Sequence, residues 1–337
     1  MSDDCVDLGH GAGGRAMARL ISDIFLDSLD NEYLRQGNDQ AAFQVEGGRM
    51  VMTTDGYVIS PLFFPGGDIG SLAVHGTIND IAMGGARPLY LSTSFIIEEG
   101  FLLADLKRIA ESMGAASRHA GVPVVTGDTK VVERGKADGV FISTTGVGIV
   151  PPGIALSGDK AVPGDKIIVS GAIGEHGVAV MSKRENLTFE TAILSDSAAL
   201  HDLVSTMLGV AGTGIRLMRD PTRGGVAATL NELTRQSRVG FRLRERDLPV
   251  KTEVAAACEL LGLDPLNVAN EGKLLAVVAP SLADGLLDAM RRHPLGHDAA
   301  IIGEVVEDAN MFVQMETAFG GERIVDWLSG EQLPRIC

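Results

Sequence analysis

The chain has 337 residues, of which 45% are hydrophobic, so it is long enough for about two domains that each bury a core. Its formal net charge of −15 and isoelectric point near 4.9 produce a negative field that repels nucleic-acid phosphates and anionic lipid surfaces. We therefore expect no nucleic-acid or membrane partner. Because no basic N-terminal segment precedes an apolar one, and no run of about 18 apolar residues occurs, we expect a soluble cytoplasmic protein.

The first half of the chain alternates segments with the apolar spacing of strands and segments with that of helices. This alternation predicts a mixed α/β domain. The expected strands are residues 49–54, 89–97, 122–126 and 140–150, and the expected helices are residues 71–83 and 102–119.

The second half shows the same alternation after a connector. Residues 151–165, PPGIALSGDKAVPGD, are rich in Pro, Gly and Asp and lack periodicity, which is typical of a linker. We therefore predict an N-terminal domain at 1–155 and a second α/β domain at 156–327. The expected strands of the second domain are 166–170, 240–243, 274–278 and 300–305, and its expected helices are 174–183, 198–208 and 222–236.

The C-terminal residues 328–337, LSGEQLPRIC, have no apolar periodicity, and Gly330 and Pro334 disfavour regular structure. They predict an extended, mobile arm. Such a segment reaches roughly 33 Å when fully extended, which is enough to cross from a domain surface to a nearby cleft.

The cysteines are Cys5, Cys258 and Cys337, and this odd number at wide spacing supports neither a disulfide framework nor a thiolate metal cluster. His293 and His297 are spaced as two metal ligands could be, but a proline and a glycine lie between them. We assign both histidines a structural role.

A glycine-rich segment, GHGAGG, occupies residues 9–14. Chain without Cβ atoms can present several backbone N–H groups to phosphate oxygens, so Gly11, Gly13 and Gly14 are candidate phosphate contacts. The segment lacks the Lys and Ser/Thr of a P-loop, and a flexible linker is the alternative.

Acidic residues stand in three further motifs of the first half: Asp55 in TTDGYV, Asp80 in HGTINDIAMGGARP and Asp128 in TGDTKVV. Carboxylates on separate segments can converge on a Mg²⁺ ion bound to a nucleotide polyphosphate. Each one singly also suits a turn or a helix cap. Asn79 beside Asp80 strengthens the joint case, and Lys130 could neutralise phosphate charge.

The second half contributes DPTRGG at 220–225 and NEGK at 270–273. Arg223 can bridge two phosphate oxygens, and the glycines precede a predicted helix N-terminus, which favours anions. Glu271 is a candidate proton acceptor or metal ligand, with a surface turn as the alternative.

These six motifs occur in the order seen in the superfamily of aminoimidazole ribonucleotide synthetase, selenophosphate synthetase, thiamine monophosphate kinase and the HypE hydrogenase maturation proteins, which the chain resembles over nearly its whole length. The resemblance implies two α/β domains, a homodimer formed through the N-terminal domains, and ATP with Mg²⁺ near the dimer interface. It assigns ATP binding to Gly11, Gly13, Gly14, Asp55, Asn79, Asp80, Asp128, Asp220, Thr222 and Asn270, with Asp55, Asp80, Asp128 and Asp220 as the metal ligands.

The final residues PRIC, 334–337, resemble the ending of the HypE family, in which the terminal thiol receives a carbamoyl group from a HypF carbamoyltransferase. That resemblance implies ATP-dependent dehydration of S-carbamoyl-Cys337 to a thiocyanate, which a HypC–HypD complex accepts as the cyanide ligand of hydrogenase iron. Cys337 would carry the reacting group, Lys130 and Arg223 would stabilise phosphoryl charge, and Glu271 would take protons from nitrogen.

Three alternatives stay open from the sequence. A selenophosphate synthetase would use Cys5 as its reactive residue, although no lysine follows Cys5 closely. An enzyme that activates a small-molecule amide would leave Cys337 without a purpose. A docking module would hold ATP only as a structural ligand. Hydrolysis of the nucleotide that depends on a carbamoylated tail would exclude a docking module.

Overall fold

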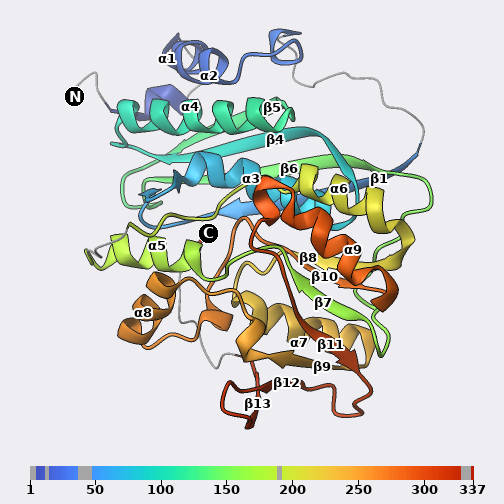
Figure 1. The fold of residues 1–337 in the computed structure, drawn as a ribbon. Helices are drawn as coiled ribbons and strands as arrows, with labels where there is room; N and C mark the ends of the chain where they lie inside the picture. The colour runs from blue at the N-terminus through green and yellow to red at the C-terminus, as the bar shows by residue number, and fades with distance from the viewer. Residues whose placement is uncertain (1–4, 12–14, 37–47, 188–191, 328–334) are drawn as a thin grey trace.

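Two main β-sheets with helices packed against them form the part of the chain that the computed structural model describes, residues 5–11, 15–36, 48–187, 192–327 and 335–337 (Figure 1). A four-stranded sheet comes from the first half and a seven-stranded sheet from the second half. The mixed α/β fold class expected from the sequence is confirmed. Within the described ranges, no helix is both long and apolar enough to cross a membrane.

The four-stranded sheet has the strand order β1-β6-β4-β5. β6 pairs antiparallel with β1 and β4, whereas β4 and β5 are parallel, so the chain between them crosses over through helix α4. Residues on β1 and β5 therefore lie on opposite edges of the sheet. The strands of the first half are β1 (Arg49–Tyr57), β4 (Arg87–Glu98), β5 (Val124–Val132), β6 (Val140–Val150) and the separate short pair β2 (Phe63–Phe64) and β3 (Gly67–Asp68).

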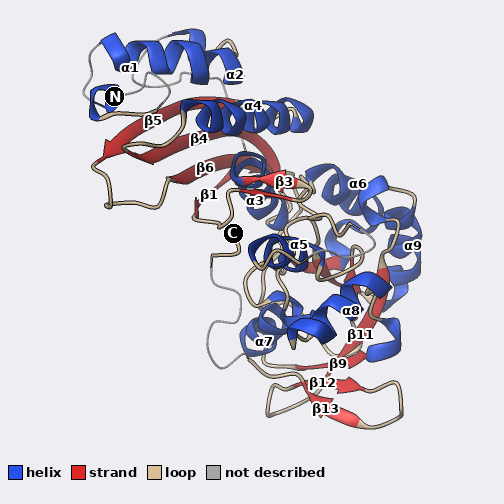
Figure 2. Ribbon diagram, turned by 90° about the vertical axis from the view of Figure 1, so that its left-hand side faces the viewer, coloured by secondary structure: helices blue, strands red, loops and turns tan. Residues whose placement is uncertain are grey.

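Helix α3 (Ile69–Met83) lies between the two sheets (Figures 1 and 2). It begins at a capping box, in which the Asp68 carboxylate accepts from the Ser71 N–H and the Ser71 hydroxyl accepts from the Asp68 N–H. The helix packs against β1, β6 and α4 (Leu103–Ala120) on one side and contacts β8 and α6 of the second half on the other. Most of its residues are therefore buried, and its polar residues Thr77, Asn79 and Asp80 lie where the two halves meet.

The seven-stranded sheet has apolar side chains on both faces because helices cover both. In β7, Ile167 and Val169 belong to the core that includes α7, while Ile168 between them belongs to the core that includes α6 and α9. The strand order is β13-β12-β9-β11-β7-β10-β8, and only β12 and β9 are parallel. These strands are β7 (Lys166–Val169), β8 (Ile215–Arg219), β9 (Gly240–Arg244), β10 (Leu275–Val278), β11 (Ala300–Val306), β12 (Val313–Glu316) and β13 (Glu322–Ile324).

The remaining helices complete the layers (Figure 1). Short helices near the N-terminus lie over α4, and α5 and α8 lie below the level of the C-terminus in this view. Their bounds are α1 (Arg15–Leu20), α2 (Asp27–Leu29), α5 (Glu175–Arg184), α6 (His201–Ala211), α7 (Gly225–Ser237), α8 (Thr252–Leu261) and α9 (Pro280–Arg291).

The elements expected from periodicity are present, with ends that differ by up to six residues. The strand expected at 122–126 is β5 and runs on to Val132, because pairing with β4 extends it through the polar TGDTK segment. The connector 151–165 contains no helix or strand, as expected. The division at residue 155 stays a prediction. Sequence patterns missed the short elements α1, α2, β2 and β3 of the first half and α8, α9, β8, β12 and β13 of the second. Residues 328–334 of the tail lie outside the described residues.

Candidate active site

Carboxylates from both halves of the chain gather at the junction between the sheets. Asp55 lies on β1, Asp80 on α3, Asp220 directly after β8, and Glu271 four residues before β10. Asp80 accepts a hydrogen bond from the Thr53 hydroxyl at 2.8 Å. Glu271 is buried, and its Oε1 has no hydrogen-bond partner within the described residues.

Burial and neighbouring negative charge raise the pKa values of Glu271 and Asp220. Burial raises the pKa of Glu271 well above its usual range, and the charges of Asp220, Asp196 and Asp55 add to that effect. Burial, followed by the charge of Asp80, raises the pKa of Asp220 to about 7. Like charges confined together in this way favour protonation or a bound cation.

Their chemistry fits a hard divalent cation, since Mg²⁺ prefers carboxylate oxygens. Among the described residues, however, no three His, Cys, Asp or Glu side chains are close enough together to form a complete ligand set. A protein site that supplies only one or two carboxylates is normal for Mg²⁺ bound with nucleotide phosphates. Of the four predicted metal ligands, Asp55, Asp80 and Asp220 lie in this cluster.

The C-terminus lies at the same junction, between β1 and α5 in both views (Figures 1 and 2). The Val58 N–H donates to the Cys337 carbonyl oxygen at 3.2 Å, and the Ser60 N–H donates to the Arg335 carbonyl oxygen at 3.1 Å. Ile336, between them, is buried in the core of the first half. The end of the chain is thus bound as a short extended segment antiparallel to residues 58–60.

Two side chains that the sequence did not single out hold this segment. The His176 ring donates from Nε2 to the Ile336 carbonyl oxygen at 2.8 Å, so its Nδ1 accepts from the Ser195 hydroxyl, also at 2.8 Å. Arg184 donates from Nη2 to the Arg335 carbonyl oxygen at 3.0 Å. A lone histidine and a helix-terminal arginine carry no motif, so only the fold could identify them.

The thiol of Cys337 faces the acidic cluster. Burial, followed by the charge of Glu271, raises the pKa of this thiol to about 12, although the charge of Arg223 opposes the shift. The predicted catalytic residues Cys337, Glu271 and Arg223 are therefore close enough to interact electrostatically.

The side-chain amides of Asn79 and Asn270 form hydrogen bonds with backbone groups of the protein. The Asn79 side chain accepts from the Leu200 N–H and donates to the carbonyl oxygens of Ala198 and Glu271. The Asn270 side chain accepts from the Gly174 N–H and donates to Pro221 and Val268 carbonyl oxygens. Both amides therefore join segments of the protein around Glu271 and use their hydrogen-bonding capacity to do so.

The loop 220–225 is held tightly against the segment that precedes Glu271. Gly225 begins α7 with a φ of 61°, and a Cβ atom there would lie 2.6 Å from the carbonyl oxygens of both Leu266 and Val268. Thr222 closes the turn by accepting from the Gly225 N–H at 2.9 Å. Glycine is required at this position because no other residue fits both the backbone angle and the space.

A buried charge network under Glu271 was also missed by the sequence. The Asp196 Oδ1 accepts from the Glu271 N–H at 3.0 Å, and its Oδ2 lies 3.5 Å from the Lys273 ammonium. Lys273 also lies 3.5 Å from Glu175. Because Asp196 is fully buried, this network fixes the backbone that carries Glu271.

Three of the predicted site residues lie at β5, away from the acidic cluster. Asp128 is on β5, opposite Ser94, whereas Asp55 shares a row with Thr144, so the pleat directs Asp55 and Asp128 to opposite faces of the sheet. Lys130 forms an ion pair with Asp128 at 2.9 Å. Gly11 packs against Val131 of the same strand. Gly13 and Gly14 lie outside the described residues.

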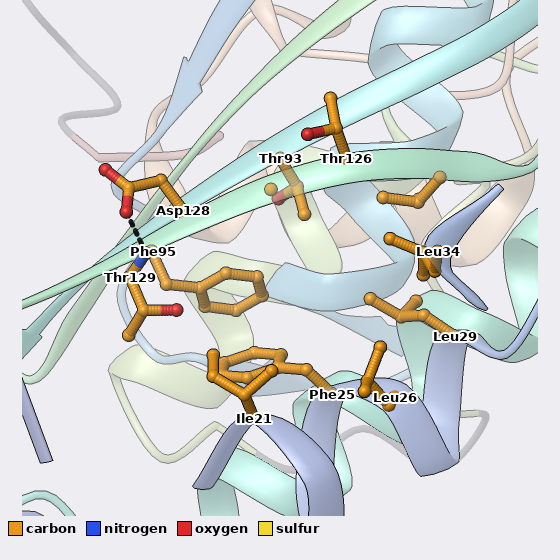
Figure 3. Close-up of a pocket in the computed structure, with 12 residues that line it drawn as sticks. Ile21, Phe25, Leu26, Leu29, Leu34, Thr93, Phe95, Thr126, Asp128 and Thr129 are labelled. Atoms are coloured by element: carbon orange, nitrogen blue, oxygen red, sulfur yellow. Dashed lines mark hydrogen bonds between the residues drawn. The ribbon is translucent and has the colours of Figure 1, made fainter. Parts of the chain in front are cut away.

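Beside Asp128 lies an apolar cavity of about 90 Å³ between the N-terminal helices and strands β4 and β5 (Figure 3). Phe25 and Phe95 lie against each other in it, with ring centroids 4.8 Å apart. The close-up shows the Asp128 carboxylate turned away from these rings. His293 and His297 lie apart from this cavity: His293 caps a short helix, and the His297 side chain is 84% exposed beside Asp298.

Comparison with known proteins agrees with this geometry over the length of the chain. Residues 37–150 match the N-terminal domain of the AIR synthase related proteins, and residues 162–316 match their C-terminal domain. The carbamoyl dehydratase HypE of Rhizobium leguminosarum bv. viciae is 73% identical over 332 residues, which are 98% of this chain and 95% of that protein.

Solved structures give the same result. A crystal structure of the hydrogenase maturation protein HypE in complex with ATP superposes with a TM-score of 0.94 at 49% identity, covering 98% of this chain and 99% of that one. The structure of a HypE–HypF complex superposes with a TM-score of 0.81 at 49% identity, covering 92% and 99%. The chain therefore belongs to the HypE family of carbamoyl dehydratases, within the AIR synthase related proteins.

Proposed function

We propose that this chain uses ATP to dehydrate an S-carbamoyl group on its own Cys337 to a thiocyanate, which supplies the cyanide ligand of hydrogenase iron. The observation that carries the proposal is the position of Cys337: its thiol lies at the inner end of the bound C-terminal segment and interacts with Glu271 and Arg223. Neither a selenophosphate synthetase nor a small-molecule amide activator needs the chain end there.

The reaction requires a proton acceptor, a means to stabilise phosphoryl charge, and a fixed substrate. The carbamoyl oxygen attacks the γ-phosphate of ATP, and the phosphate then leaves with that oxygen while the nitrogen loses its protons. In the proposed reaction, Glu271 accepts a proton from nitrogen, and Arg223 stabilises the developing phosphoryl charge. Residues 58–60 hold Cys337 during both steps.

Asp55, Asp80 and Asp220 are our proposed Mg²⁺ residues. When bound, the ion would neutralise phosphate charge and offset the carboxylate charges that, after burial, raise the pKa of Glu271. The charge of Asp55 acts on both Asp80 and Asp220, and the Thr53 hydroxyl on β1 holds the Asp80 carboxylate of α3.

The high pKa of the Cys337 thiol suggests that carbamoylation of the thiol and dehydration of the carbamoyl group take place at different positions of the tail. A thiol whose pKa is raised to about 12 is protonated at neutral pH and is a poor nucleophile. The bound position thus suits the uncharged S-carbamoyl group, and carbamoylation by a HypF-type partner requires the thiol to leave this position.

After dehydration, a HypC–HypD-type complex would accept the cyanide in the cytoplasm.

A homodimer would explain the separated residues Gly11, Asp128 and Lys130. Met50, Met52 and Ile96 are exposed on the same outer sheet face as Asp128, with Met52 72% exposed. Pairing of this face with a second copy would bury apolar surface and bring Asp128 of one subunit toward the acidic cluster of the other. We propose residues 1–155 as the ATP-binding and dimerisation domain and 156–327 as the second domain.

The decisive experiment follows the mass of the C-terminal peptide. Incubation with a HypF-type carbamoyltransferase, carbamoyl phosphate and ATP should first add one carbamoyl group to Cys337 and then remove one water. The Cys337→Ala variant should bind ATP and show neither change. A carbamoylated peptide that persists with ATP present would contradict the proposal.

A further inference from the structure

The bound C-terminal segment is recognised mainly through its backbone. His176 and Arg184 contact the carbonyl oxygens of Ile336 and Arg335, and two backbone N–H groups of residues 58–60 contact Arg335 and Cys337. Arg184 also donates to the Ser60 carbonyl oxygen from Nε at 2.9 Å, which fixes its guanidinium. Arg184 is thus held by residue 60 as well as by the segment itself.

Two side chains add selectivity to the backbone contacts. Ile336 is 3% exposed, and its site is apolar because it belongs to the core of the first half. Arg335 donates from Nε to the Val58 carbonyl oxygen at 2.8 Å and pairs with Asp138. Because Arg335 and Asp138 are 37% and 68% exposed, solvent screens that ion pair, and burial of Ile336 should contribute more to binding.

All of these described contacts involve only residues 335–337 of the segment. None of the described interactions depends on how Arg335 is connected to the rest of the chain. We propose that residues 58–60, His176 and Arg184 form a binding site for a C-terminal peptide that ends in Arg-Ile-Cys, and that the enzyme dehydrates an S-carbamoylated peptide of this kind supplied as a separate molecule. The inference rests on the proposed function and extends it from the protein's own tail to peptides.

The reaction on the peptide has the same balance as on the tail. The C–O bond of the carbamoyl group breaks, its oxygen leaves in inorganic phosphate, the γ-phosphoryl bond of ATP breaks to give ADP, and the nitrogen loses both protons as the nitrile forms. ATP is the co-reactant, and no oxidant or reductant takes part.

The test uses the full-length Ile336→Asp/Cys337→Ser variant, whose own tail lacks the thiol and no longer fits the apolar site. A synthetic peptide ending in Arg-Ile-S-carbamoylcysteine is added with ATP, and its mass is followed for the loss of one water. Without the tether, binding needs peptide at a concentration on the order of millimolar. Wild-type protein carbamoylated on its own tail is the parallel reaction and tests the proposed function separately.

Peptide variants test the contacts without altering the protein. Alanine in place of the isoleucine should raise the KM on the order of tens of fold, because three buried carbon groups of the side chain are lost. Alanine in place of the arginine should raise it only slightly. In the protein, Arg184→Ala and His176→Asn should raise the KM for the peptide, whereas His297→Ala, an exposed histidine, should not. ATP binding by each variant checks that it is folded.

Dehydration of the tail together with no dehydration of the peptide at millimolar concentration would overturn the inference and leave the proposed function intact. Equal KM values for the isoleucine and alanine peptides, or no effect of Arg184→Ala and His176→Asn in folded proteins, would likewise overturn the assigned site. Failure of the tail reaction itself would instead count against the proposed function.

Discussion

Carboxylates at this junction oppose the stability of the folded protein while they serve the site. The pKa of Asp220, raised to about 7 by burial and by Asp80, means that ionising this group costs free energy in the fold. Its unfolded pKa is near 3.8, so the folded state binds the proton more tightly between pH 3.8 and about 7. Stability from this group is therefore greatest at low pH and is lost as the pH rises through that window.

Asp220→Asn should consequently stabilise the ligand-free protein at pH 8, by an amount on the order of 1–3 kcal/mol, and have little effect at pH 4. The same variant should weaken nucleotide binding in the presence of Mg²⁺. Urea unfolding at the two pH values and a nucleotide titration check both effects. Equal destabilisation at both pH values would show that the carboxylate is not strained in the fold.

Glu271→Gln should bind ATP and form nitrile slowly, because glutamine keeps the shape of the side chain but accepts no proton. The expected signature is ADP formation without matching thiocyanate, which places the defect after phosphoryl transfer. Quantifying both products from the same reaction measures it. A variant that turns over normally would require another base.

At the scale of elements, short connections rather than helices and strands hold the site together. The loop 220–225, the segment 192–200 and residues 268–271 meet around Glu271 through Asn79, Asn270 and Asp196. Buried amides whose hydrogen bonds are all made fix such loops, since breaking any one leaves a buried polar group unpaired.

Gly225→Ala should therefore lower the free energy of unfolding by at least about 2 kcal/mol, because the residue has a left-handed φ and its new Cβ would overlap two carbonyl oxygens. Gly209→Ala is the matched control: it lies inside α6 with nothing within 4 Å of the added Cβ, and should raise stability by up to about 1 kcal/mol. Denaturant unfolding of both proteins makes the comparison. Similar values for the two would refute the steric argument.

At the scale of the whole molecule, the space at the junction between the sheets limits what can follow Cys337. The Cys337 carbonyl oxygen accepts from the Val58 N–H, and its thiol is largely enclosed beside Glu271. Any added residues would have to be buried alongside a segment that already fills its site.

A few residues added after Cys337 should thus block thiocyanate formation, whereas the same tag before Met1 should be tolerated. The C-terminal peptide mass after reaction with ATP provides the measurement. Thiocyanate formed at the normal rate by the extended protein would mean that the terminal position has another cause.

The proposed dimer leads to a complementation experiment. Asp80→Asn and Asp128→Asn should each weaken ATP binding, but a mixed dimer of the two would contain one intact site if each site uses Asp80 from one subunit and Asp128 from the other. Mixed dimers should then regain about half of the wild-type activity per dimer. If mixing restores no activity, either Asp80 and Asp128 of the same subunit serve one site, or Asp128 does not belong to the ATP site.

Local sequence alone determined the alternation of helices and strands, the mixed α/β class, and the motifs that carry the family resemblance. These features depend on the spacing of apolar residues and on residue types at neighbouring positions, which the chain displays directly. Asp55, Asp80, Asp220, Glu271, Arg223 and Cys337 were all identified in this way and lie together in the structure.

Only the tertiary structure decided which candidates converge. Asp55 and Asp128 stand in similar motifs, yet strand order and the pleat place them on opposite edges and faces of one sheet. His176, Arg184 and Asp196 have no local signal, because their roles arise from contacts with segments distant in the sequence. The side chains of Asn79 and Asn270 join loops of the protein to one another, which the sequence did not indicate, and their part in nucleotide binding stays a prediction. Long-range packing sets these distances, and no periodicity within a single segment encodes them.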